Sequence, residues 1–311
     1  MFERRTLSSE LAAVRDAHAP GALVLDRPVS IVSGGDERAR ITPAGSAEST
    51  VYVSANEVTL SGVAIDGSGT EAAVTAGSGF AGRDTDTPSG LTVSESRLTG
   101  GAVGFLERSA PAARLVASEL TADSTGVRLQ GPQRSAASQN RISDAVTGIE
   151  IGGVITSVTE NEIQTVDEAG IVVTTPPEAI GQLGVEGGPI SENVVDGATD
   201  GIVVEGATDS PIEDNQLRNI RRTGISVTGR TLGPIRGNSI EGAETGIQID
   251  GTAEGPVEGN EFVDVAQKQR ESTGDPGSSS ADLVLYGATA IAVVALFVPY
   301  ISRQIRRRRQ S

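Results

Sequence analysis

Four arginine residues lie in or between two insertions of the sequence, where they could bind an anionic ligand. The insertions, residues 77–89 and 175–188, interrupt an otherwise regular spacing of motifs. The arginines are Arg83 in the first insertion and Arg108, Arg114 and Arg134 between the two. Guanidinium groups pair well with carboxylates and phosphates, and surface loops commonly carry binding sites. The sequence therefore predicts a groove for an anionic glycan or an acidic partner, with tolerated insertions and ordinary surface arginines as the alternative.

A second group of residues with possible chemistry is acidic. Its members come shortly before a Gly-Ile or Gly-Val step, and they are Asp123, Asp144, Asp167, Glu168, Asp200 and Glu244. Carboxylate oxygens suit calcium, so calcium is a possible cofactor. The alternative is a solvated acidic surface, because the sequence contains no loop with the fixed spacing of a calcium-binding motif.

The sequence does not show a catalytic site, and we assign no catalytic or metal-binding residue. In the recurring segment G-I-x-V the x residues should point outward, because alternate residues of a strand face opposite ways. These residues are Leu106, Arg128, Glu150, Val172, Val203, Ser226 and Gln248. Arg128 and Glu150 could pair, but no two acids are neighbours in this column, so it holds no carboxylate pair of a glycosidase. The absence of Cys excludes disulfides and thiolate chemistry.

The elements that must position these residues are defined by a repeat of about 22 residues. The motif consists of N-x-[IVL], then five or six residues, then G-[IV]-x-[VIL]. It recurs along the chain, two upstream copies begin with Ser in place of Asn, and the last copy is only half a motif. The copies begin at Ser96, Ser118, Asn140, Asn161, Asn193, Asn215, Asn238 and Asn260, in steps of 22, 22, 21, 32, 22, 23 and 22 residues. Such a period is typical of a solenoid.

Each copy reads as short β segments separated by Gly, Pro, Asn and Asp, without the 3.6-residue pattern of a helix. We therefore predict an all-β fold, a right-handed single-stranded parallel β-helix over residues 21–266, with about ten turns stacked roughly 4.8 Å apart. The six repeat asparagines are expected to stack as a structural ladder of amides, with an active groove as the alternative. They are Asn140, Asn161, Asn193, Asn215, Asn238 and Asn260.

The two ends of the chain differ from the repeat. Leu7, Leu11 and Val14 have helical spacing, so residues 1–20 are predicted to form an amphipathic helix that caps the coil. After a polar linker at 267–282, residues 283–301 carry no charge and are predicted to span a membrane, with a buried core helix as the alternative. The basic tail, residues 302–311, places the C-terminus in the cytoplasm and the β-helix outside the cell.

Export of the β-helix is not explained by the first residues. Residues 1–30 contain no apolar run of the length found in signal peptides. Three explanations stay open: a clipped or misassigned start, unconventional export, or a β-helix that remains cytoplasmic. We favour the first.

The repeat from about residue 7 to 265 resembles the parallel β-helix repeat of the pectate-lyase-like superfamily. The segments LSSELAAVRDA, IVSGGDERARITP and VYVSANEVTLSGVAIDG resemble the opening of the NosD-type branch. That branch is associated with copper delivery to nitrous oxide reductase, so the resemblance implies an accessory role in the cell envelope. Copper requires thiolate, thioether or imidazole ligands. The chain offers only Met1 and His18, so copper binding is not carried over.

The charge of the chain narrows the class of partner. The net charge is -16, and Lys268 is its one lysine, a composition that resembles the proteins of extreme halophiles, haloarchaea in particular. So acidic a body excludes nucleic acid as a partner. We expect a membrane-anchored cell-surface protein with a binding or structural role, recognising a polysaccharide or an envelope partner. The alternatives are a polysaccharide lyase, hydrolase or epimerase, and an accessory protein to an envelope metalloenzyme or transporter.

Overall fold

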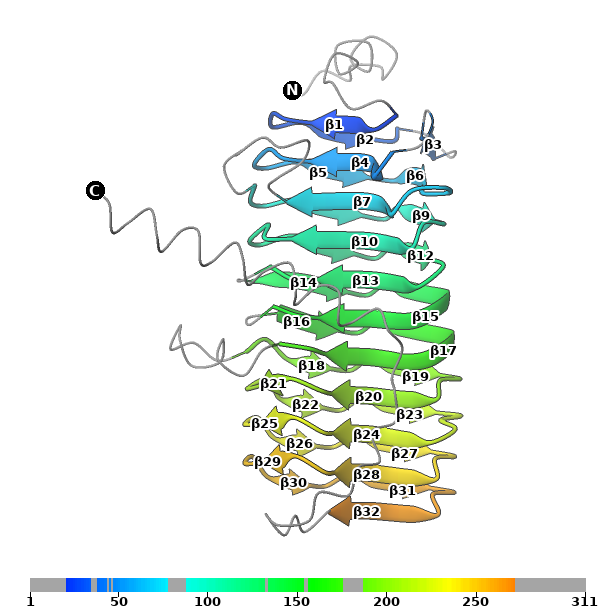
Figure 1. Cartoon of the computed structure of the whole chain (residues 1–311), viewed down its shortest axis with the longest axis vertical. Coiled ribbons are helices and arrows are strands. Elements are labelled where there is room, and N and C mark those ends of the chain that lie inside the picture. Colours follow the sequence, from blue (N-terminus) through cyan, green and yellow to red (C-terminus); the bar gives the residue numbers. More distant parts are fainter. Residues whose placement is uncertain are drawn as a thin grey trace, which may run out of the picture. The chain divides into compact units, whose positions relative to one another are not determined.

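The computed structural model describes residues 21–34, 38–43, 45, 47–77, 88–131, 134–153, 156–175 and 187–271. All regular elements within these ranges are strands, wound into a right-handed parallel coil (Figure 1). The predicted β-helix is therefore confirmed. The predicted N-terminal cap at 1–20 lies outside the described residues, as do most of both insertions. A search of the described ranges finds no helix long and apolar enough to cross a membrane.

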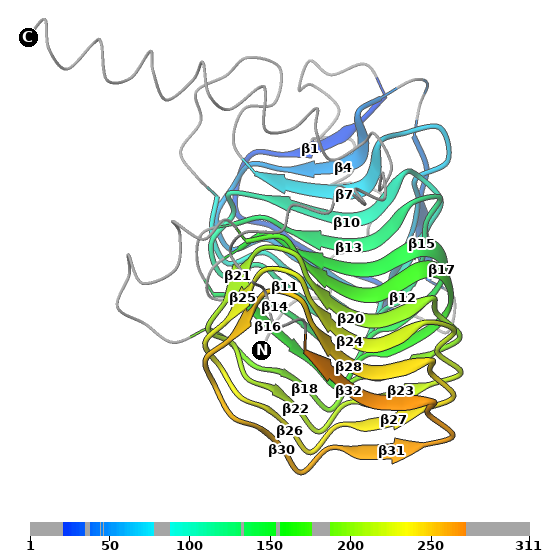
Figure 2. The same ribbon diagram turned by 60° about the horizontal axis from the view of Figure 1, so that its bottom comes forward.

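Three sheets line the coil, and Figure 2 shows how successive turns stack. The largest sheet has 19 strands: β1 (Leu23–Leu25), β3 (Ala39–Ile41), β4 (Ser49–Val53), β6 (Val63–Asp66), β7 (Ala72–Gly77), β9 (Arg97–Thr99), β10 (Val103–Arg108), β12 (Glu119–Thr121), β13 (Thr125–Leu129), β15 (Arg141–Ile151), β17 (Glu162–Val173), β19 (Val194–Asp196), β20 (Asp200–Val204), β23 (Gln216–Arg218), β24 (Thr223–Val227), β27 (Ser239–Glu241), β28 (Thr245–Ile249), β31 (Glu261–Val263) and β32 (Gln267–Glu271).

The second sheet has ten strands, one from each turn: β2 (Ser30–Val32), β5 (Thr59–Ser61), β8 (Thr92–Ser94), β11 (Arg114–Val116), β14 (Ser135–Ser138), β16 (Thr156–Thr159), β18 (Ile190–Ser191), β22 (Ile212–Glu213), β26 (Ile235–Arg236) and β30 (Val257–Glu258). A third sheet of three short strands appears only in later turns: β21 (Ala207–Thr208), β25 (Arg230–Thr231) and β29 (Thr252–Ala253).

The core is built from columns of like residues on successive turns. The Ile of each G-I-x-V segment lies in register with the next, from Ile149 through Ile171 and Ile202 to Ile225. These four side chains are completely buried. The glycine before each Ile is required by space: a Cβ on Gly148 would lie 2.5 Å from the carbonyl oxygen of Gly170 on the next turn. The turns can approach closely only where no side chain intervenes.

The coil continues past its predicted end. We expected a polar linker from residue 267, but Gln267–Glu271 forms β32, which pairs in parallel with β28. The residues of β32 are polar, yet their backbone groups pair with β28 and extend the coil by one strand. Polar and charged side chains on the last strand of a sheet protect its edge from pairing with another chain. Contacts divide the chain into Met1–Ser272 and Thr273–Ser311. The remainder of the predicted linker, the span at 283–301 and the tail at 302–311 fall outside the described residues.

Candidate functional site

Most arginines of the coil are held by carboxylates on neighbouring turns. One column on the 19-stranded sheet alternates in sign along Arg97, Glu119, Arg141 and Glu162. In this column Arg97 Nε donates to Glu119 at 2.8 Å, and Arg141 Nε donates to Glu162 at 3.0 Å. Equivalent pairs join turns elsewhere: Arg40–Asp66, Arg128–Glu150, Arg222–Asp200, Arg230–Glu254 and Arg236–Glu213. Such arginines stabilise the stack and are not free to bind a ligand.

Arg108 belongs to this paired class, which corrects its predicted role. Its guanidinium donates to Glu48 at 2.9 Å and also to Glu71. Burial opposes the charge of Arg108, but the two carboxylates outweigh burial and raise its pKa. Acids from two earlier turns therefore pair with one of the four arginines of the predicted groove. Arg83 lies outside the described residues.

Arg114 and Arg134 remain available for binding. Both side chains are exposed, and neither has a carboxylate within 4.0 Å among the described residues. Arg114 begins β11 and pairs in register with Ala136, two residues after Arg134. Because β14 begins at Ser135, Arg134 directly precedes the strand that pairs with β11, and the two arginines lie on adjacent turns. The structure thus brings together two of the four predicted arginines.

A buried carboxylate that the sequence analysis missed holds the turns on which these arginines lie. Glu107 is completely buried, and its carboxylate accepts hydrogen bonds from the backbone N–H groups of Ala110 and Gly131, each at 2.5 Å. Burial raises the pKa of Glu107, although the hydrogen bonds from Ala110 and Gly131 act in the opposite direction. A signal was present in the sequence, because Glu107 occupies the last position of G-F-L-E, where later copies carry Leu, Ile or Val.

The six repeat asparagines form a continuous ladder, in which the first five are buried and Asn260 is half-buried. Asn161 Nδ2 donates to Asn193 Oδ1 at 2.9 Å, and Asn193 Nδ2 donates to Asn215 Oδ1 at 3.0 Å. The second Nδ2 hydrogen of Asn193 reaches the carbonyl oxygen of Val158 at 2.9 Å. The residue before each ladder position is left-handed, as in Glu192 at a φ of 58°. This backbone turn aims each amide along the coil, so the ladder is a structural element and presents no active groove.

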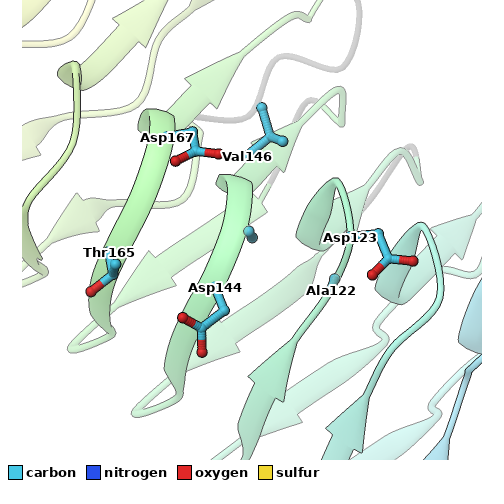
Figure 3. Close-up of a pocket in the computed structure, with 7 residues that line it drawn as sticks. Ala122, Asp123, Asp144, Val146, Thr165 and Asp167 are labelled. Atoms are coloured by element: carbon cyan, nitrogen blue, oxygen red, sulfur yellow. The ribbon is translucent and has the colours of Figure 1, made fainter.

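Three of the predicted acidic residues line one depression in the surface. Asp123, Asp144 and Asp167 come from successive turns, and their carboxylates do not converge on one point (Figure 3). Asp200 is instead 5% exposed and bound to Arg222. Within the described ranges, no group of three His, Cys, Asp or Glu side chains is arranged to hold a metal ion. The predicted acidic set is therefore divided between separate environments, and the structure does not assemble it into a calcium site.

A different acidic group forms around Glu205. Partial desolvation raises the pKa of Glu205, and the charges of Glu150 and Glu168 raise it further. Glu150 also accepts a hydrogen bond from Nε of Arg128 at 2.7 Å. This bond confirms the pair predicted among the outward x residues of the G-I-x-V segments. A carboxyl group whose pKa is raised by neighbouring carboxylates is a feature of general acids. Glu205 is thus the feature that favours the carbohydrate-active alternative.

Part of this coil is similar to a known protein family. Residues 184–277, less than a third of the chain, match the family described as "Periplasmic copper-binding protein (NosD)". The predicted resemblance to the NosD family is therefore confirmed, although the match lies in later turns than the opening segments on which it was predicted. No curated protein matches the chain. The chain is also similar to the catalytic unit of an α-1,3-glucanase from Streptomyces thermodiastaticus, at 12% identity and a TM-score of 0.34. The alignment covers 85% of this chain and 65% of the glucanase.

The residues present do not fit the copper named in the family description. Copper sites use imidazole, thiolate or thioether ligands. The described residues contain no His, Cys or Met side chain. We therefore derive no step through copper.

Proposed function

We propose that this protein is a β-helix of the cell envelope that binds an anionic polysaccharide through Arg114 and Arg134. The observation that supports the proposal is the contrast between these two exposed arginines and the paired arginines of neighbouring turns. The body is acidic overall, but at physiological salt charges beyond about 8 Å are largely screened. A local pair of guanidinium groups can therefore hold carboxylate or sulfate groups of a glycan.

Replacing both arginines by serine should remove this binding. We expect Arg114→Ser/Arg134→Ser to lower the affinity for alginate, a polymer of uronates, by about tenfold or more. Calorimetry should be done at about 0.15 M KCl, where the acidic body is screened, or at the lowest higher concentration that preserves the circular dichroism spectrum. The matched control is Arg97→Ser/Arg141→Ser, which removes two paired arginines and the same charge. Equal affinities for the two double variants would contradict the proposal, as would a wild-type protein that does not bind alginate.

We also propose that residues 283–301 anchor the protein in a membrane, with the β-helix outside the cell. The support is a run of 19 uncharged residues between Asp282 and Arg303, followed by further arginines. Because the chain has no Cys, single cysteines can report the topology. A membrane-impermeant maleimide should label Ser279→Cys on intact cells and Ser311→Cys only after lysis. The reverse pattern, or labelling of both on intact cells, would contradict this arrangement.

A further inference from the structure

One outer face of the coil lacks the acids that cover the rest of the molecule. Its residues are the outward positions of β5, β8, β11, β14 and β16, which we call the hydroxyl face: Thr59, Ser61, Thr92, Ser94, Arg114, Val116, Ala136, Ser138, Ser157 and Thr159. They alternate with buried residues, and all but Arg114 are half-buried. Seven carry a hydroxyl group, and Arg114 alone is charged. In a chain with 41 acidic residues, this face is distinct.

The register of the strands makes the hydroxyl face regular. Thr59, Thr92 and Arg114 form one column, and Ser61, Ser94 and Val116 form a second. Successive members of a column are separated by one strand spacing, about 4.8 Å. Ser94 Oγ donates to Ser61 Oγ at 3.1 Å, so neighbouring hydroxyls are within hydrogen-bonding distance along the coil.

Charge returns at the borders of the hydroxyl face. In later turns the outward residues of β22 and β26 are Glu213 and Arg236, which pair with each other. Glu95 directly follows β8 and Glu160 directly follows β16. Both have a left-handed backbone conformation, at φ angles of 50° and 56°. Arg134 lies at the opposite border, directly before β14. Among the described residues of this surface, Arg114 thus lies at its middle and Arg134 at one side.

We propose that the hydroxyl face binds one extended anionic polysaccharide chain laid along the coil, with Arg114 and Arg134 pairing its acidic groups. This inference rests on the proposed function and adds the surface and the extended form of the ligand. Ser and Thr hydroxyls both donate and accept hydrogen bonds, as sugar hydroxyls do. A glycan lying along the coil meets at least one hydroxyl group on four of these five strands, β5, β8, β14 and β16. A second copy of this chain fits less well, because a two-fold contact over this face would bring Arg114 near Arg114 of the other copy without an acid between them.

The test places acids on this face and compares them with acids elsewhere on the same turns. Ser94→Asp/Ser138→Asp/Thr159→Asp charges the hydroxyl face. The control, Thr99→Asp/Ser143→Asp/Gln164→Asp, charges the half-buried outward positions of the strands that follow, β9, β15 and β17. We expect the first variant to lose about tenfold or more in affinity for alginate and the control to stay within about twofold. Wild-type protein should also bind the polymer more tightly than the uronate disaccharide.

The outcomes separate this inference from the proposed function. If alginate binding requires Arg114 and Arg134 but the two triple variants bind equally, the extended face is wrong and the arginine site stands. If wild-type protein does not bind alginate, both proposals fail. If sedimentation shows a wild-type dimer without glycan that the hydroxyl-face acids dissociate, the face is an interface between copies and the inference is overturned. Circular dichroism establishes that each variant is folded.

Discussion

Asn193→Ala should destabilise the β-helix by about 3 kcal/mol or more, because the change breaks the ladder at its middle. Asn193 is completely buried, and its Oδ1 accepts both the backbone N–H of Asn161 and the Nδ2 of Asn161, the first at 3.0 Å. Its Nδ2 donates to Val158 and Asn215. Alanine leaves these buried groups without partners and leaves a cavity. Urea unfolding at constant KCl measures the loss, which corresponds to a shift in Tm on the order of 10 °C.

Two further variants make this expectation specific to the ladder. Asn193→Asp keeps the accepting oxygen but replaces the donor with a second acceptor, so we expect a large loss that grows as the carboxyl ionises. Asn56→Ala serves as the control, because Asn56 is exposed and its bonds to Ser89 lie at the surface. We expect that control to cost less than about 1 kcal/mol. Similar losses for Asn56→Ala and Asn193→Ala would show that the ladder does not carry the stability assigned to it.

Glu107→Leu should lower the free energy of unfolding by about 2–3 kcal/mol at mildly acidic pH. The aliphatic side chain matches its neighbours in the column, since Glu107 pairs in register with Ala76 and Leu129. It nevertheless leaves the N–H groups of Ala110 and Gly131 without acceptors. Glu107→Gln keeps one accepting oxygen, and we expect an intermediate loss. The control is Glu119→Leu, whose carboxylate is exposed and paired with Arg97, with an expected loss below about 1 kcal/mol.

The effect of Glu107→Leu should depend on pH in a defined direction. Burial raises the pKa of Glu107 above its ordinary value of 4.5, so the folded protein binds this proton more tightly than the unfolded chain. The stabilisation that Glu107 provides is therefore complete below pH 4.5 and is lost as the pH rises through the raised pKa. The wild type should exceed Glu107→Leu in stability by more at about pH 5 than at about pH 8. A difference that is constant or grows with pH would contradict this account.

Glu107 places a carboxyl group among the aliphatic side chains of the core. Burying an ionised group costs several kcal/mol unless hydrogen bonds compensate. At Glu107 the hydrogen bonds that offset part of this cost come from the turns after β10 and β13, at Ala110 and Gly131. The same bonds hold the backbone at Ala110 and Gly131, four residues before Arg114 and three before Arg134.

The repeat by itself determined the architecture of this protein. A 22-residue period with Asn, Gly and Ile at fixed places specifies one stacked turn, because each of these residues meets its equivalent on the next turn. The ladder from Asn140 to Asn260 and the buried Ile column follow from that period alone. The end of the coil did not follow, because β32 pairs through its backbone although its side chains are polar.

Only the tertiary structure decided which charged residues are free. Arg108, Arg114 and Arg134 look alike in the sequence, yet Arg108 is bound by Glu48 and Glu71, which precede it by 60 and 37 residues. Pairing across turns depends on which side chains project from neighbouring strands, and an outward arginine meets an acid or a hydroxyl according to its column. The sequence period locates a residue on its turn, but the side chains of the adjacent turns determine whether its charge is satisfied.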